Sequence, residues 1–192
     1  MNKLAKIGRI YRYMLCKHPI ITQSIQTGLL MASGDVIAQK IIEKRCELNS
    51  LRTAQFFALG TVVVGPAVTV WYKLLSRLIT DRGKSAALKK MALDQLIFAP
   101  TFLAVFIALL NSMQGKDLDF IKKELSCKYK DILISNYKLW PTVQLVNFYM
   151  VPLMFQVLFT QIVALIWNAY LSWKTQQGVA DKDGEEDDDE DD

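Results

Sequence analysis

Four small or polar residues share one face of an otherwise apolar stretch, residues 18–39 (HPIITQSIQTGLLMASGDVIAQ). At 100° per residue they fall within about 60° of one another on a helix, and they are Ser24, Gly28, Asp35 and Gln39. Small residues let two helices approach closely, whereas a carboxylate inside a membrane often faces water or the bundle interior. We therefore expect this face either to pack against another helix, with Asp35 hydrogen-bonded there, or to line a water-filled path.

A second set of polar side chains occurs in residues 139–173, which contain no charged residue. If one helix runs through this stretch, they fall within about 120° of each other, and they are Gln144, Asn147, Gln161 and Asn168. A straight helix of this length would measure about 52 Å, which is too long for one simple crossing. Pro152 lies inside it, so we expect a bend near residues 148–152.

Asp94 is the single charged residue of the apolar stretch 91–115. It lies one helical turn after Lys90, and we expect the two to pair at a membrane interface rather than Asp94 to form a site in the membrane centre. Three further residues predict close contact or kinks in the helices, because glycine lacks a Cβ and proline lacks an N–H; they are Gly65, Pro66 and Pro100. Aromatic residues near the ends of apolar stretches are typical interface anchors; they are Trp71, Tyr72, Trp140 and Trp173.

Groupings typical of enzymes are absent from the sequence. His18 is the single histidine, and no serine–histidine–aspartate set, HExxH, P-loop or GxGxxG occurs. We therefore expect no catalytic activity, cofactor or bound metal. The basic residues would fall on both sides of a membrane, which argues against direct binding of nucleic acid. Cys46 and Cys127 would pair if their side of the membrane is oxidising; otherwise they and Cys16 are free thiols.

The charged residues of the chain come in clusters that separate four long apolar runs. A bilayer core about 30 Å thick needs roughly 20 apolar helical residues, and each run reaches that length. The sequence therefore predicts an all-α integral membrane bundle of four transmembrane helices with interfacial amphipathic helices. The expected spans cover about residues 18–42, 53–80, 88–114 and 139–173.

Three segments lie outside these spans. Residues 1–17 form a basic amphipathic helix, which is either a retained interfacial helix or a mitochondrial presequence. In residues 116–135 apolar positions recur every three or four residues, which predicts an amphipathic loop helix lying at the interface. Residues 174–192 hold ten of the nineteen acidic residues, which predicts a disordered tail and a basic protein partner of unknown identity.

Several segments together resemble one known family. They are GPAVTVWYKLLSRL (65–78), ALKKMALDQLIFAP (87–100), NYKLWPTVQLVNFYMVPLMFQ (136–156), WNAYLSWK (167–174), HP (18–19) and GDVIAQ (34–39). Over about residues 10–174 the chain is similar to the Mpv-seventeen and peroxisomal membrane protein two family, and KKMALDQ resembles its mitochondrial inner-membrane branch most. The resemblance implies four transmembrane helices, a place in the mitochondrial inner membrane or, alternatively, the peroxisomal membrane, and a channel-like role in mitochondrial homeostasis and mitochondrial DNA maintenance.

Two positions depart from the family pattern. Thr69 stands where many members carry histidine, and Gln156 stands where many carry arginine. The second change removes a cation from the membrane region, and any anion preference that this arginine sets in the family would not carry over to this chain.

Three functions remain open at the level of sequence. The first is a channel for small solutes, lined by the two polar faces; because one bundle leaves little lumen, such a channel is narrow, gated or a homo-oligomer. The second is a specific carrier of nucleotides or their precursors, although no inverted repeat is visible. The third is a non-transporting membrane scaffold. In each case the lipid bilayer is the immediate partner.

Overall fold

The computed structural model describes residues 3–44, 46–81 and 83–167, and within these ranges the chain is helical without strands. The α-helices are α1 (Lys3–Lys17), α2 (Pro19–Ile37), α3 (Ser50–Leu59), α4 (Gly65–Leu78), α5 (Lys84–Leu93), α6 (Ala99–Met113), α7 (Leu118–Met150) and the unlabelled helix Leu153–Trp167. Three π-helical turns extend or join them: η1 (Ala38–Ile42), η2 (Gly60–Val64) and η3 (Asp94–Phe98).

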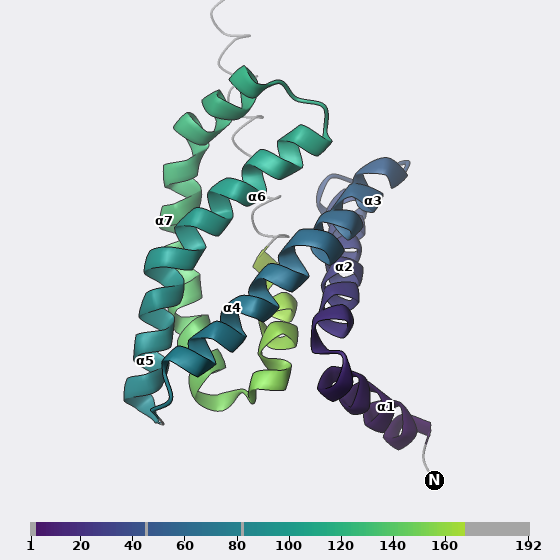
Figure 1. The fold of residues 1–192 in the computed structure, drawn as a ribbon. Coiled ribbons are helices and arrows are strands. Elements are labelled where there is room, and N and C mark those ends of the chain that lie inside the picture. Colours follow the sequence, from purple (N-terminus) through teal and green to yellow (C-terminus); the bar gives the residue numbers. More distant parts are fainter. Residues whose placement is uncertain (1–2, 45, 82, 168–192) are drawn as a thin grey trace, which may run out of the picture.

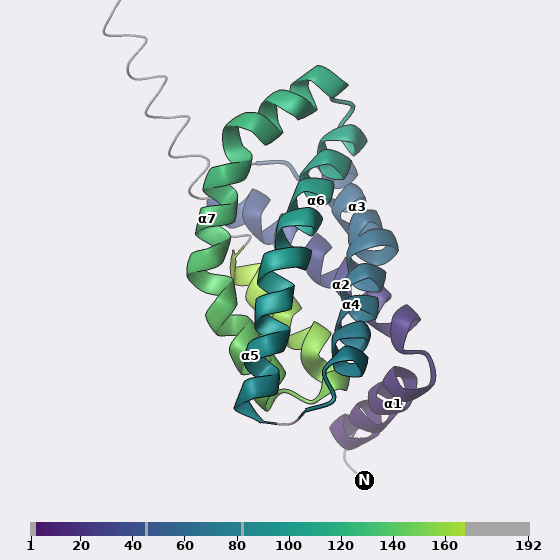
Figure 2. The same cartoon turned by 60° about the vertical axis from the view of Figure 1, so that its left-hand side comes forward.

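The helices form a bundle in which the chain direction alternates (Figures 1 and 2). The helix formed by α2 and η1 starts at the end of the bundle that holds α1 and runs to the opposite end. The continuous helix Ser50–Leu78 then returns, and Lys84–Met113 runs back toward the opposite end. α7 comes back alongside α5 and α6, and Leu153–Trp167 then rises again. The described chain therefore makes four passes along the bundle and begins a fifth with Leu153–Trp167, so the predicted bounds of the last span are wrong.

The error lies in the last third of the chain. The sequence predicts a separate interfacial helix over 116–135 and one bent helix over 139–173, whereas α7 is a single helix that joins the first of these to the start of the second. The chain then reverses at Val151 and Pro152 instead of bending. Val151 is extended, with φ −91° and ψ 126°, because a residue before proline avoids the helical region and proline has no N–H to continue the ladder.

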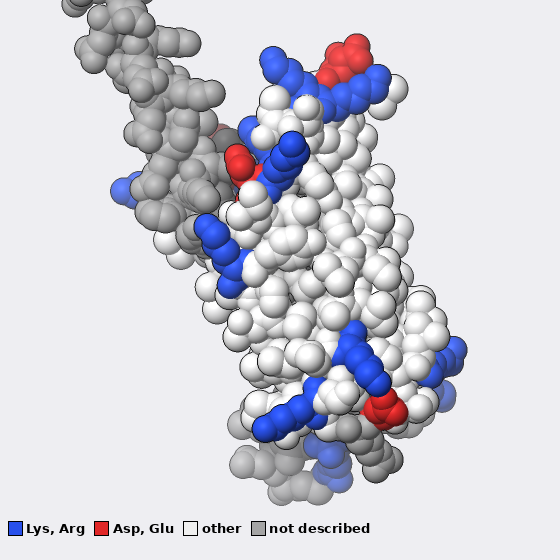
Figure 3. Space-filling model, turned by 90° about the vertical axis from the view of Figure 1, so that its left-hand side faces the viewer, with Lys and Arg blue, Asp and Glu red and all other residues white. Residues whose placement is uncertain are grey.

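The exterior of the bundle is apolar and its interior is partly polar, which inverts the pattern of a soluble domain. On the face in Figure 3, charged side chains gather toward the two ends and uncharged side chains lie between them. Large apolar side chains such as Val62 and Leu96 are 72% and 71% exposed, whereas Thr27 and Asn147 are fully buried. Two described helices, Ser50–Leu78 and Lys84–Met113, are long and apolar enough to cross a membrane.

Proline positions coincide with two of the π-helical turns. The N–H of Gly65 bonds the carbonyl of Gly60, and the N–H of Ala99 bonds that of Asp94, each five residues back. Proline follows directly in both cases, as Pro66 and Pro100. The wider turn relieves the clash between a proline ring and the carbonyl four residues earlier. The predicted kink positions are thus places where the helix widens but continues.

Small residues bring α2 and η2 into backbone contact. A Cβ added to Gly60 would lie 2.8 Å from the Cα of Gly28, and one added to Gly65 would lie 2.5 Å from the Cα of Ser24. Both distances are too short for real atoms, so only glycine fits at these crossings. The structure therefore uses the Ser24 and Gly28 part of the first polar face for helix packing.

α1 is attached to the bundle by its second half. Leu15 is buried, the hydroxyl of Tyr11 donates to the side chain of Gln26, and Thr22 Oγ1 donates to the Met14 carbonyl at 3.2 Å. These contacts hold α1 against the start of α2, where Figure 1 shows it at one end of the bundle.

Candidate functional site

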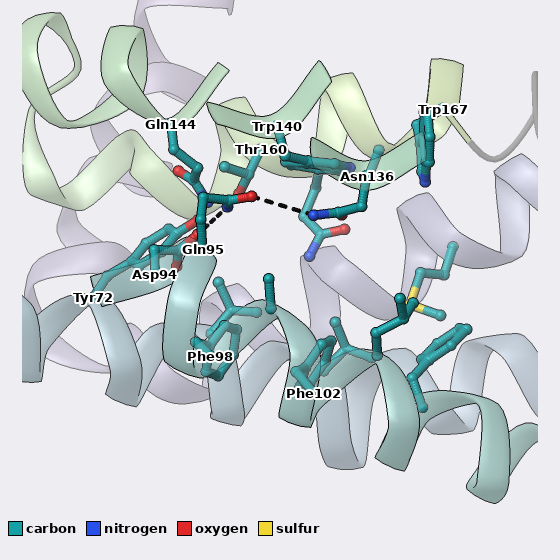
Figure 4. Close-up of a pocket in the computed structure, with 18 residues that line it drawn as sticks. Tyr72, Asp94, Gln95, Phe98, Phe102, Asn136, Trp140, Gln144, Thr160 and Trp167 are labelled. Carbon is teal, nitrogen blue, oxygen red and sulfur yellow. Dashed lines mark hydrogen bonds between the residues drawn. The ribbon is translucent and has the colours of Figure 1, made fainter. Parts of the chain in front are cut away.

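A cavity of about 190 Å³ lies between α2, α4, α6, α7 and the helix Leu153–Trp167. Its polar end carries hydroxyl, amide and carboxylate groups, from Tyr72, Asp94, Gln95, Asn136, Gln144, Thr160 and Gln161. Its other walls are apolar or aromatic, with Met31, Phe98, Phe102, Phe106, Trp140 and Trp167 among them. Figure 4 shows the labelled polar side chains converging from four helical segments above Phe98 of η3 and Phe102 of α6.

The carboxylate of Asp94 is held in a chain of hydrogen bonds. Trp71 Nε1 donates to its Oδ1 at 2.8 Å, and Gln95 Nε2 donates to its Oδ2 at 2.8 Å. Asn136 Nδ2 in turn donates to Gln95 Oε1 at 3.2 Å. Because η3 begins at Asp94, the widened turn presents both Asp94 and Gln95 to the cavity. The predicted pairing with Lys90 is wrong. The donors to the two Asp94 carboxylate oxygens, Trp71 and Gln95, are uncharged, and Asp94 is only 2% exposed.

A second set of hydrogen bonds joins α4 to α7. Gln144 Nε2 donates to the hydroxyl oxygen of Tyr72 at 2.9 Å, and Asn147 Nδ2 donates to Gln144 Oε1 at 3.0 Å. All three side chains are buried, and the ring of Phe148 meets that of Tyr72 edge-on at 5.3 Å. Neutral polar groups bonded to each other in this way satisfy most of their hydrogen-bonding capacity without charge.

The aromatic residues predicted to anchor the interface have other roles. Trp71 donates to Asp94 and stacks on Phe98 with ring centroids 5.0 Å apart. Tyr72 is buried, and Trp140 lies within α7 against the cavity. These three residues therefore make contacts inside the bundle that the anchor prediction does not include. Trp173 lies outside the described residues.

Asp35 and Gln39 do not line the cavity. Asp35 Oδ1 lies 2.7 Å from Nε of Arg52 at the start of α3, and its Oδ2 accepts from Thr53 Oγ1 at 2.6 Å and from Gln39 Nε2 at 2.7 Å. Arg52 also lies 2.7 Å from Glu43. This ionic cluster joins Asp35 of α2, Gln39 of η1 and Glu43 to the start of α3. Of the two expectations for Asp35, contact with a neighbouring helix is the one that the structure displays.

The polar residues of 139–173 meet across two antiparallel helices and not along one. Gln144 on α7 and Gln161 on the following helix both line the cavity, and Asn147 supports Gln144 from one turn away. Asn168 lies outside the described residues. Gln95, Asn136 and Thr160 were not singled out by the sequence. Gln95 had a signal, a polar side chain beside Asp94 in an apolar run, whereas Asn136 lies in a charged stretch where nothing distinguishes it.

The two departures from the family pattern have structural roles away from this cavity. Thr69 Oγ1 donates to Gln23 Oε1 at 2.6 Å and so joins α4 to α2. Gln156 Nε2 donates to the carbonyl oxygen of Val151 at 3.1 Å and lies 3.4 Å from the carbonyl oxygen of Asn147. The Gln156 side chain thus caps the end of α7. The three cysteines are exposed free thiols, so Cys46 and Cys127 are not bonded in the structure.

Known proteins match the chain along most of its length. The Mpv17 / PMP22 family profile matches residues 111–172. Mitochondrial inner membrane protein Mpv17 of Danio rerio is 45% identical over 176 residues, which cover 91% of this chain and 99% of the relative. The Homo sapiens protein of the same name is 45% identical over 173 residues (89% and 98%), and Protein SYM1 of Gibberella zeae is 37% identical over 173 residues (88% and 97%).

No solved structure matches the chain at a significant level. Several of these relatives are named for the mitochondrial inner membrane, and two described helices of this chain suit a bilayer. Together these findings give the location of the chain. The chain is a protein of the mitochondrial inner membrane and belongs to the Mpv17 / PMP22 family.

Proposed function

We propose that the chain is a channel-like protein for small solutes, with a narrow path along the axis of its own bundle. The observation that carries the proposal is a cavity within the bundle that is polar at one end and lies between helices with apolar outer faces. In a bilayer a polar interior needs hydrogen-bond partners, and water or a polar solute supplies them. A volume of about 190 Å³ has room for several waters.

The apolar segments proposed to cross the hydrocarbon are α2 with η1, Ser50–Leu78, Lys84–Met113 and the helix that starts at Leu153. α7 returns the chain between the last two and supplies cavity-lining side chains from its second half. This arrangement keeps four apolar spans, as the family resemblance implies, and adds α7 as an amphipathic lining helix. A wider pore would require a homo-oligomer.

The cavity favours a channel for small solutes over a nucleotide carrier. Among its described lining residues no lysine or arginine occurs, and Asp94 contributes a carboxylate. Phosphate groups are bound in proteins by cationic side chains or helix N-termini, so a nucleotide would find little complementary charge there. Through the solutes it passes, such a channel would contribute to mitochondrial homeostasis and to mitochondrial DNA maintenance.

Filling the cavity provides the test. Ala164 lines it, whereas Ala54 is exposed on α3. In planar bilayers, purified protein should give stepwise unitary currents that Ala164→Phe lowers and Ala54→Phe leaves unchanged. Saturable exchange of labelled nucleotide without current would instead support a carrier, and neither current nor exchange would support a scaffold. Equal currents from parent and Ala164→Phe would place the path outside this bundle, for example between copies of the chain.

A further inference from the structure

A second cavity, of about 260 Å³, lies in the same bundle on the side of α1. Its walls come from the start of α2, from α4 and from the start of the helix Leu153–Trp167, with Gln23, Thr69, Leu153 and Val157 among them. Cys16, which is exposed, and Lys73 bring this cavity to the bundle end. The second cavity thus lies at the end of the molecule where Figure 1 shows α1.

Tyr72 is the residue that the two cavity linings share. Neighbouring residues on α4 line different cavities: Thr69 lines the second cavity and Val68 lines the first. On the last helix Val157 faces the second cavity and Thr160 the first. In Figure 4 the ring of Tyr72 lies at the end of the first cavity away from Trp167. Tyr72 is therefore a buried side chain that borders both spaces.

The position of that side chain is held by core packing and by a hydrogen bond between side chains. The Tyr72 hydroxyl accepts from Gln144, which is itself held by Asn147. Phe148 contacts the ring at its edge, at 5.3 Å. These groups are uncharged, and the Asp94 carboxylate lies beside them in the lining of the first cavity. Loss of one neutral hydrogen bond shifts such an equilibrium by about 2- to 13-fold.

We infer that the two cavities are the halves of one route through the bundle and that Tyr72 is the gate between them, latched by Gln144. The inference rests on the proposed channel function and adds its regulation. In the closed state the ring fills the junction. When the hydroxyl leaves Gln144 and the ring turns aside, the first cavity joins the second and the route reaches the α1 end.

Two substitutions at Tyr72 test the gate, with Tyr149→Ala as the matched control because Tyr149 is 52% exposed on α7 and lines neither cavity. The readouts are unitary current in potassium chloride across planar bilayers and urea flux into proteoliposomes. Tyr72→Ala removes the partition and should raise unitary conductance and urea flux several-fold. Tyr72→Phe keeps the ring but removes the hydroxyl, so conductance should stay the same while opening becomes about 2- to 13-fold more frequent.

The outcomes separate the gate from the channel itself. If the parent conducts and both variants equal it, the gate is overturned and the channel stands. If the parent and Tyr72→Ala are both silent although folded by circular dichroism, the proposed channel fails and the gate with it. A silent parent with a conducting Tyr72→Ala supports both. If Tyr72→Ala does not fold, Tyr72→Phe decides, and an unchanged opening frequency overturns the gate.

Discussion

Replacing Arg52 with leucine should destabilise the fold by about 3–5 kcal/mol, the usual cost of removing one partner from a buried ion pair. The side chain of Asp35 is 0% exposed and that of Arg52 is 23% exposed, with Nε and Oδ1 2.7 Å apart. Leucine keeps much of the apolar stem but leaves the carboxylate buried with uncharged donors only. Glu43 loses the same partner at 2.7 Å, which adds to the loss.

The two donors that remain limit the effect. Thr53 and Gln39 still bond Asp35 Oδ2, at 2.6 and 2.7 Å, and a hydrogen bond to a charged group contributes about 1.5–3 kcal/mol. These bonds keep the carboxylate from being fully orphaned, so we do not expect the loss to exceed the upper figure. The second substitution Asp35→Asn, made in the Arg52→Leu background, removes the stranded charge and should recover most of the stability.

The measurement is equilibrium unfolding in mixed detergent micelles, followed by tryptophan fluorescence. Lys89→Met is the control, because Lys89 and Asp81 form a pair of similar length, 2.8 Å, with both side chains more than half exposed. That control should change stability too little to resolve, since exposed pairs are screened by solvent. An Arg52→Leu loss as small as the control's, or a double variant no more stable than Arg52→Leu, would show that burial of Asp35 is not what makes the pair matter.

Three further predictions concern packing, titration and the polar interior. Gly28→Ala should cost at least about 1–3 kcal/mol, because its Cβ would meet backbone, whereas Gly8→Ala, with open space around it, should be neutral or slightly stabilising; thermal unfolding compares the two. The hydrogen bond from Lys89, and then the charge of Lys89, lower the pKa of the Asp81 carboxyl. Lys89→Met should therefore return that pKa toward its ordinary value in an NMR titration. The stabilisation from this pair is present above the ordinary pKa of Asp81 and is lost as pH falls through the lowered pKa. Asn147→Leu should cost about 1–3 kcal/mol because it leaves a buried amide oxygen of its partner without a donor, and an unchanged unfolding midpoint with unchanged flux would show that this polar contact is incidental.

Much of the architecture can be predicted from residue type and spacing alone. Apolar runs between clusters of charge predict helices in a membrane, because a backbone in hydrocarbon has to satisfy its own hydrogen bonds. The same reasoning placed polar residues of the first and last runs inside the bundle, and Ser24, Asp35, Gln144, Asn147 and Gln161 are all buried. Burial of these side chains follows from one fact: an amide or carboxylate facing lipid has no partner.

The partner of each buried group depended on tertiary structure. Asp35 and Asp94 look alike in sequence, each a lone acid in an apolar run, yet Asp35 pairs with Arg52 and Asp94 with Trp71 and Gln95. Helical periodicity says which residues share a face but not which helix meets that face. The cavity and its separation by Tyr72 therefore could not be read from spacing, since their walls come from helices far apart in the chain.

Two prolines show the same division. The sequence gives both Pro141 and Pro152 the same local effect, loss of a backbone donor. In the structure Pro141 lies inside an unbroken α7, whereas the chain reverses at Pro152. A proline in a membrane helix is tolerated where packed neighbours hold the backbone in place, and α5 and α6 pack along α7. Residue type determined where the chain can turn, and the packing of neighbouring helices decided where it does.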